Sequence, residues 1–150
     1  MNQTIKQPEE FNLKDIFIGS EYIIPIYQRN YAWEKDEIAP NTFSVIDGQQ
    51  RLTTLFLLLT FLRDETLSKK ALRFEAREKS NFTLNDLREK HNLEKDGFYS
   101  NEIIDGFDVI QNYFSIQEVK NQEYKHQFIS KFENILIIRT QVPKQIDLNH

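Results

Sequence analysis

Five consecutive residues, Asp47-Gly48-Gln49-Gln50-Arg51, combine the features of a phosphate-binding turn. They follow residues 43–46, which predict a strand, and precede residues 52–62, which are apolar on nearly every side and predict a buried helix. The first amides of such a helix have no intrahelical partner, and the helix dipole adds partial positive charge. Gly48 lets a phosphate approach the backbone, and Arg51 offers it a planar fork of donors. The motif therefore predicts an anion site.

The other side chains of this motif allow a functional and a purely structural interpretation. Gln49 and Gln50 can donate neutral hydrogen bonds, while Asp47 can hold Mg²⁺, orient a water molecule or bind a sugar hydroxyl. Alternatively, Asp47 is the N-cap of the helix, and Gln50 three residues later completes a pair that resembles a capping box. The two interpretations can hold together.

A second group of polar and aromatic residues, Tyr27-Gln28-Arg29, lies just after a predicted strand at residues 22–24. In an extended chain Arg29 lies on the same side as Tyr31 and Trp33. One interpretation is therefore an edge strand in which Arg29 stacks on an aromatic ring. The functional alternative rests on the presence of two Gln-Arg elements beside strand ends, where they could clamp one polyanion.

The rest of the sequence predicts an α/β (α+β) fold whose second half is mainly helical. Expected helices lie at residues 12–17, 52–62, 83–91, 103–114 and 124–132. Expected strands lie at residues 22–24, 43–46, 71–75 and 135–138. Asn12 is expected to cap the first helix and Gly19 to end it. Pro25 indicates an edge strand or a strand end, and the β-branched run at residues 135–138 is typical of a buried strand.

The composition limits the possible classes of protein. The chain has 150 residues with 12 Phe and 6 Tyr, enough for one domain with an aromatic-rich core. A formal net charge of −4 argues against a protein that coats DNA with a basic surface. The sequence has no Cys, no signal peptide and no apolar run that could span a bilayer, so we expect a cytoplasmic protein without a membrane partner. The three His lack metal-ligand spacing, and neither a P-loop nor a Rossmann glycine motif occurs.

Two segments, IPIYQRNYAW at residues 24–33 and VIDGQQRLTTL at residues 45–55, together resemble the N-terminal domain of GmrSD-type modification-dependent restriction proteins. That domain is similar in fold to the ParB/sulfiredoxin group. The resemblance implies a role in defence against phage or other foreign DNA, with binding and hydrolysis of a nucleoside triphosphate with Mg²⁺. It implies catalytic roles for Asp47, Gln50 and Arg51, with Asp47 as the metal ligand. The nucleotide-binding residues that it implies are Tyr27, Gln28, Arg29, Gly48, Gln49 and Arg51.

The chain departs from the family pattern in three respects. Only residues 34–46 lie between the first segment and the Asp47-Gly48-Gln49-Gln50-Arg51 motif, which indicates missing residues or a deletion, with Ile38 to Phe43 as the expected place. The chain ends where relatives continue into a helix and an Asn-x-x-Gly segment, and it contains no His-Asn-His nuclease domain. We therefore expect an N-terminal fragment. It comprises a ParB-like nucleotide-binding core at residues 1–62 and a mainly helical, truncated extension ending in a strand at residues 63–150.

Three hypotheses about function follow from these observations. The first is a nucleotide-hydrolysing domain in which Arg51 and the helix N-terminus hold phosphates and Arg29 adds a second positive contact. The second is a DNA-binding module without turnover. The third is a fragment that becomes active only when joined to its C-terminal part. The expected partners are a nucleotide, DNA through the full-length protein, and a second copy of the chain.

Overall fold

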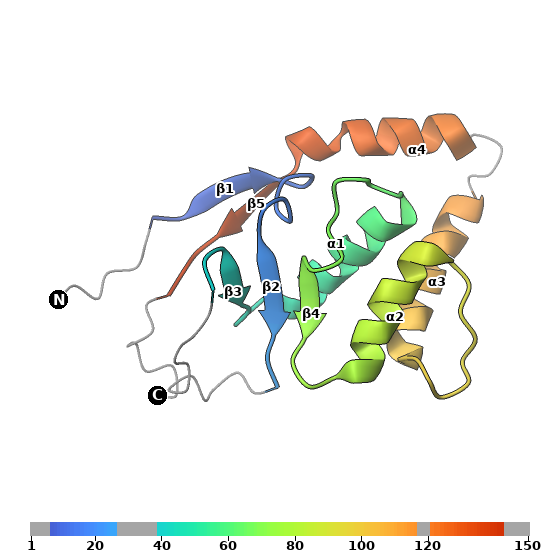
Figure 1. Cartoon of the computed structure of the whole chain (residues 1–150). Coiled ribbons are helices and arrows are strands. Elements are labelled where there is room, and N and C mark those ends of the chain that lie inside the picture. Colours follow the sequence, from blue (N-terminus) through green and yellow to red (C-terminus); the bar gives the residue numbers. More distant parts are fainter. Residues whose placement is uncertain (1–6, 27–38, 117–120, 143–150) are drawn as a thin grey trace.

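The computed structural model describes residues 7–26, 39–116 and 121–142 and has an α+β fold (Figure 1). Its strands are β1 (Glu9–Asn12), β2 (Glu21–Ile24), β3 (Thr42–Ser44), β4 (Leu72–Phe74) and β5 (Leu136–Arg139). Its helices are α1 (Gln49–Phe61), α2 (Glu78–Glu89), α3 (Asn101–Ile116), α4 (Asn121–Ser130) and the short 3-10 helix η3 (Phe132–Asn134). The predicted α+β class with a mainly helical second half is confirmed. The ParB/sulfiredoxin-like assignment stays a prediction.

The strands form two small sheets. One sheet is parallel with the order β3-β2-β4, and the other pairs β1 with β5 in antiparallel orientation. Because β3 and β4 are parallel strands of one sheet, α1 forms the crossover between them. Pro25 directly follows β2, which is the central strand, so it marks a strand end and not an edge strand.

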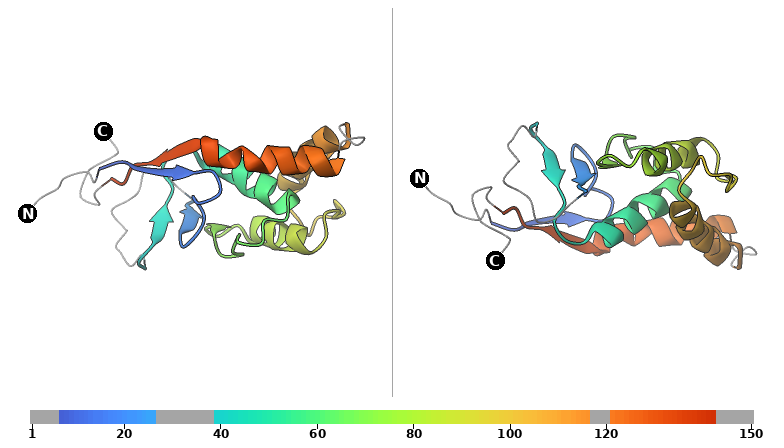
Figure 2. Two further views of the ribbon diagram at one scale, coloured as in Figure 1. Left: turned by 90° about the horizontal axis from the view of Figure 1, so that it is seen from above. Right: turned by 90° about the horizontal axis from the view of Figure 1, so that it is seen from below.

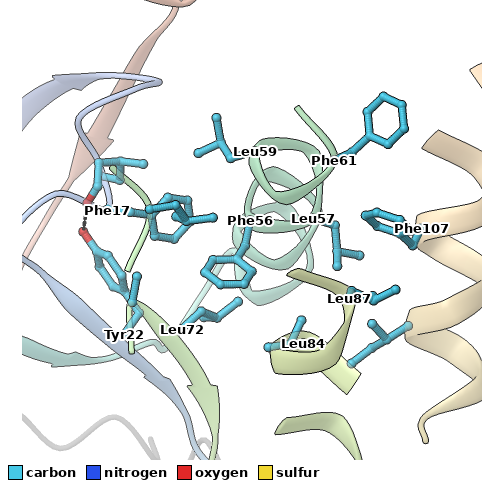
Figure 3. Close-up of a cluster of buried hydrophobic side chains, with 14 of the residues drawn as sticks. Phe17, Tyr22, Phe56, Leu57, Leu59, Phe61, Leu72, Leu84, Leu87 and Phe107 are labelled. Atoms are coloured by element: carbon cyan, nitrogen blue, oxygen red, sulfur yellow. Dashed lines mark hydrogen bonds between the residues drawn. The ribbon is translucent and has the colours of Figure 1, made fainter. Parts of the chain in front are cut away.

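Helix α1 is the centre of the hydrophobic core. It runs between the parallel sheet with α2 on one side and the β1–β5 sheet with α4 on the other (Figure 2). Phe56 and Leu59 are buried, with 1% and 2% of their surface exposed. Figure 3 shows Phe17, which precedes β2, beside Phe56, while Phe107 on α3 lies on the other side of the helix near Leu57 and Phe61. The predicted helix that is buried from several directions is confirmed.

The helix expected at residues 12–17 is wrong, because this segment forms consecutive turns. The amides of Asp15 and Ile18 each donate to the carbonyl three residues earlier, and the Asn12 side chain accepts a further bond from the amide of Asp15. Strand β1, which the sequence did not predict, already uses Asn12. Too few residues then remain before Gly19, with its left-handed φ of 72°, to form helical i to i+4 bonds. The three apolar residues of the expected face are nevertheless buried: Leu13, Ile16 and Phe17.

Two other expectations are corrected. Helix α2 begins at Glu78 and not at Thr83, whose hydroxyl donates to the Lys79 carbonyl one turn earlier and so acts within the helix. Strand β5 is not buried, because Leu136 and Ile138 are 61% and 62% exposed. The cause is its place in a two-stranded antiparallel sheet, in which only one face packs on the core.

The described residues share one cluster of buried side chains that runs from Leu13 to Phe132. The division at residue 62 therefore stays a prediction about sequence regions. No helix in the described part of the chain is long and apolar enough to cross a bilayer.

Candidate functional site

The 47–51 motif lies at the carboxyl end of β3. After β3, the amide of Val45 still donates to the carbonyl of Ile23 at 2.9 Å, so the pairing with β2 continues. The chain then turns at Asp47 and Gly48, and α1 begins directly afterwards. The structure therefore has the predicted order of strand, glycine turn and helix.

Gly48 makes the turn from β3 into α1. Its φ of 80° and ψ of 20° lie in the left-handed region, which glycine enters at the lowest cost. Its carbonyl accepts the amide of Leu52 at 2.9 Å, and this is the first bond of the helix. The amides of Gln49, Gln50 and Arg51 therefore precede the intrahelical ladder.

The expected N-cap at Asp47 is wrong. Gly48 is the N-cap residue of α1, no side chain caps this end, and the first turn contains no acidic residue. Because Gly48 occupies the N-cap position, Asp47 lies one residue before it and cannot cap the helix. The capping-box-like interaction between Asp47 and Gln50 is therefore not formed. The positive end of the α1 dipole is left without a carboxylate from its own first turn.

The side chain of Gln49 stabilises the turn between β3 and α1. Its side-chain Nε2 donates to the Val45 carbonyl at 3.0 Å, and its own carbonyl accepts the hydroxyl of Thr53 at 2.8 Å. One N–H of the Gln49 amide is thus used to hold strand β3 against the helix. The sequence predicted Gln49 as a ligand residue, and its contact with the strand adds a structural role.

The three residues predicted as catalytic are open to solvent. Asp47, Gln50 and Arg51 are exposed, and among the described residues their side chains have no hydrogen-bond or ion-pair partner. The Arg51 guanidinium therefore has no carboxylate partner to release before it contacts an anion. An exposed guanidinium in the first turn of a helix, where the backbone amides lack intrahelical partners, suits phosphate oxygens.

The carboxyl ends of β2 and β4 lie at the same edge, since all three strands are parallel. At this edge the Glu75 carboxylate, just after β4, accepts the amide of Ile26 at 3.1 Å. The Glu75 amide in turn donates to the Ile24 carbonyl at 2.8 Å. Glu75 therefore holds Ile26, the residue immediately before the predicted Tyr27-Gln28-Arg29 segment. That segment lies outside the described residues.

Glu75 is a residue at this edge that the sequence did not mark as functional. One signal was available in the sequence. Glu75 is the last residue of the strand predicted at residues 71–75, close to the position that Asp47 occupies after the strand at residues 43–46. Polar residues that follow parallel strands meet at one edge of a sheet.

Asp47 is suited to bind a metal ion only when a bound nucleotide supplies further coordinating oxygens. Among the described residues, no group of three or more His, Asp or Glu side chains could hold a metal ion. Mg²⁺ is commonly bound through one or two carboxylates plus the phosphates of a substrate. A single exposed carboxylate therefore suits an Mg²⁺ ion that arrives with a nucleotide, and does not suit a metal ion held by the protein alone.

A shallow hollow between the first turns of α2 and α3 is separate from this motif. It is lined by residues 76–80, 97 and 99–102, and none of residues 47–51 contributes to it. Its lining carries both signs of charge, with Arg77 and Lys79 against Glu78 and Glu102. The hollow is therefore not part of the predicted phosphate site.

Comparison with known proteins supports the family resemblance predicted from the 47–51 motif. The family model of the GmrSD restriction endonuclease N-terminal domain matches residues 37–149, well over half of the chain. The match includes the 47–51 motif and begins after the Tyr27-Gln28-Arg29 segment. No curated protein and no solved structure gives a significant match. The chain therefore belongs to the GmrSD restriction endonuclease N-terminal domain family, which indicates a component of a restriction system.

Proposed function

We propose that the chain is a domain that binds and hydrolyses a nucleoside triphosphate within a modification-dependent restriction system that defends against phage. The observation that carries the proposal is the start of α1, where uncapped amides and an Arg51 without a partner among the described residues stand at the end of a parallel strand. Helix N-termini at the carboxyl ends of parallel strands are the common position for phosphate groups in open α/β sheets.

Each residue of the motif has a defined part in this proposal. Gly48 keeps the backbone clear of side-chain atoms, since even a Cβ built there would meet nothing within 4 Å. The first amides of α1 and the Arg51 fork bind the phosphates, and Arg51 stabilises the charge that develops during transfer. Gln50 is exposed and can orient the attacking water through its side-chain amide.

Asp47 would hold the Mg²⁺ that accompanies the nucleotide, and this ion would neutralise phosphate charge. The residues of the Tyr27-Gln28-Arg29 segment remain proposed contacts, with Glu75 holding Ile26 immediately before that segment. DNA would engage the full-length protein, and a second copy of the chain is a further proposed partner. The proposed setting is the cytoplasm.

Calorimetric titration with ATP and GTP in the presence of Mg²⁺ tests the proposal. We expect the wild-type chain to bind one of them and Arg51→Ala to bind it at least about tenfold more weakly, because a charge-assisted hydrogen bond is lost. Arg73→Ala is the matched control, since Arg73 is also exposed and pairs only with Glu21 at 3.6 Å. Unchanged affinity in Arg51→Ala would contradict the proposal. Salt-sensitive DNA binding that no nucleotide competes with would favour the DNA-binding alternative.

A further inference from the structure

We propose that Arg139 is a positioning residue for the 47–51 motif, because its guanidinium fixes strand β3, which leads into that motif. Arg139 is the last residue of β5, and only 15% of its side chain is exposed. The proposal extends the proposed function by naming a residue, far away in sequence, on which the geometry of the phosphate site depends.

The Arg139 guanidinium lies between two aromatic rings from different sheets. Its Cζ is 4.1 Å from the ring centroid of Phe43 on β3 and 4.5 Å from that of Phe11 on β1. Both distances are well within the range of cation–π attraction, which is stronger for a partly desolvated cation. Arg139 therefore connects the β1–β5 sheet to the parallel sheet, in addition to the hydrophobic core that both sheets share.

Hydrogen bonds fix the orientation of the guanidinium plane. Nη1 donates to the Ser20 hydroxyl at 3.1 Å and to the Tyr22 hydroxyl at 3.0 Å. Nε and Nη2 both donate to Oε1 of Glu9, at 3.3 and 3.0 Å. Only a planar fork with several donors can satisfy these three partners at once, which a lysine ammonium cannot do in the same geometry.

Tyr22 connects this arrangement to the core. Its hydroxyl donates to the Ile16 carbonyl at 2.8 Å while it accepts from Arg139, so both of its hydrogen-bonding functions are used. Its ring stacks on Phe43 at 5.6 Å, across the β2–β3 pairing in which the two residues are register partners. Phe43 is thus held on one side by Tyr22 and on another by Arg139.

Phe43 stands four residues before Asp47 in a strand of only three residues. The pairing of β3 with β2 extends past it only to the bond from Val45 to Ile23. β3 is an outer strand of the parallel sheet, so its position depends on β2, on packing of Phe43 and Val45 against the core, on the Gln49 bond to Val45, and on the contact with Arg139. Loss of Arg139 is therefore expected to loosen β3 and the turn that follows it more than the rest of the molecule.

Hydrogen exchange measured peptide by peptide tests this inference without any nucleotide. In Arg139→Met we expect the hydrogen-bonded amides within residues 43–51, such as that of Val45, to exchange about tenfold faster, while those of α3 change little. Arg139→Lys keeps the positive charge but lacks the fork, so it should not restore slow exchange. Arg73→Met is a control for the loss of an arginine with a glutamate partner in the same sheet.

A second control separates local positioning from general loss of stability. Leu87→Ala removes a side chain that is 1% exposed and belongs to α2, so it destabilises the core away from β3. If Leu87→Ala, compared at an equal loss of thermal stability, speeds exchange at residues 43–51 as much as Arg139→Met does, the inference is overturned. Unchanged exchange there in Arg139→Met would overturn it as well.

Nucleotide affinity adds a separate measurement. We expect Arg139→Met to weaken binding of the preferred nucleotide, ATP or GTP with Mg²⁺, several-fold while Arg73→Met does not. If the wild-type chain binds neither nucleotide, the proposed function fails, and the exchange result alone still decides whether Arg139 holds the turn.

Discussion

The side-chain amide of Gln49 donates a hydrogen bond of 3.0 Å to the backbone carbonyl of Val45, and so joins the first residue of α1 to the end of β3. This bond connects the residues on either side of the turn that contains the left-handed Gly48, and so stabilises that turn. Since the proposed phosphate site uses backbone amides, its shape would depend on this closure as well as on Arg51.

The Gln49 bond gives the first prediction. Gln49→Glu keeps the size of the side chain but replaces the donor with a carboxylate, which would face the Val45 carbonyl and stand at the start of the helix. We expect affinity for nucleotide with Mg²⁺ to fall, because the turn opens and a negative charge lies beside the phosphates. Calorimetry measures the change. Thr54→Val, an exposed position in the same helix, is the control, and equal affinities in both variants would contradict this role for Gln49.

Gly48 gives a prediction about stability. A Cβ at this position meets no atom within 4 Å, so the cost of Gly48→Ala comes only from the φ of 80°. We expect Gly48→Ala to lower the free energy of unfolding by about 1–2 kcal/mol, as measured by urea denaturation. Gly48→Asn should lose less, because asparagine tolerates left-handed backbone. If the alanine and asparagine variants are equally stable, the left-handed turn is not required.

Asn81 gives a prediction about the free edge of β4. Its Oδ1 accepts the amide of Phe74 at 2.8 Å, and its Nδ2 donates to the carbonyl of the same residue at 2.9 Å. Asn81 thereby replaces a neighbouring strand and attaches α2 to β4. We expect Asn81→Ala to reduce the free energy of unfolding by about 1–3 kcal/mol, since two backbone groups lose their partner. Asn85→Ala, at an exposed position of the same helix, should have almost no effect, and similar losses in both variants would count against this bridge.

His91 gives a prediction about pH. Burial lowers its pKa below 6.5, and the nearby charges of Arg63 and Lys125 lower it further. Its Nε2 has no hydrogen-bond partner, and its ring stacks on Phe61 at 5.6 Å. Well above pH 6.5 the imidazole is neutral in both the folded and the unfolded chain, so it adds no pH dependence there. As the pH falls below 6.5, the unfolded chain binds the proton first and the folded state loses stability.

Urea denaturation at pH 7 and at pH 5.5 tests this prediction. Part of the loss in stability between the two pH values should disappear in His91→Gln. His126→Gln should retain the full loss, because His126 is exposed on α4. The prediction fails if the wild-type chain and His91→Gln lose equal stability on acidification.

Local signals explain which parts of the site could be predicted from the sequence. A glycine between an apolar run and a longer apolar stretch predicted the strand, the turn and α1, because each depends on neighbouring residues. The choice between Asp47 and Gly48 as N-cap could not be made in this way. The N-cap position depends on the φ angle of Gly48, and the residue types alone do not determine that angle.

Contacts between distant residues explain the rest. Arg139 and Glu9 are 130 positions apart, and neither β1 nor its pairing with β5 has a sequence pattern of its own. The expected burial of the run at residues 135–138 failed for the same reason. Hydrophobicity predicts a strand there, but the number of covered faces depends on which strand it pairs with.

The most direct test of the central claim is a crystal structure of the chain with a non-hydrolysable ATP or GTP analogue and Mg²⁺. The account predicts phosphate density at the start of α1, within hydrogen-bonding distance of the first helical amides and of the Arg51 guanidinium, with the metal ion beside Asp47. Nucleotide bound with its phosphates elsewhere, for example in the hollow between α2 and α3, would contradict it.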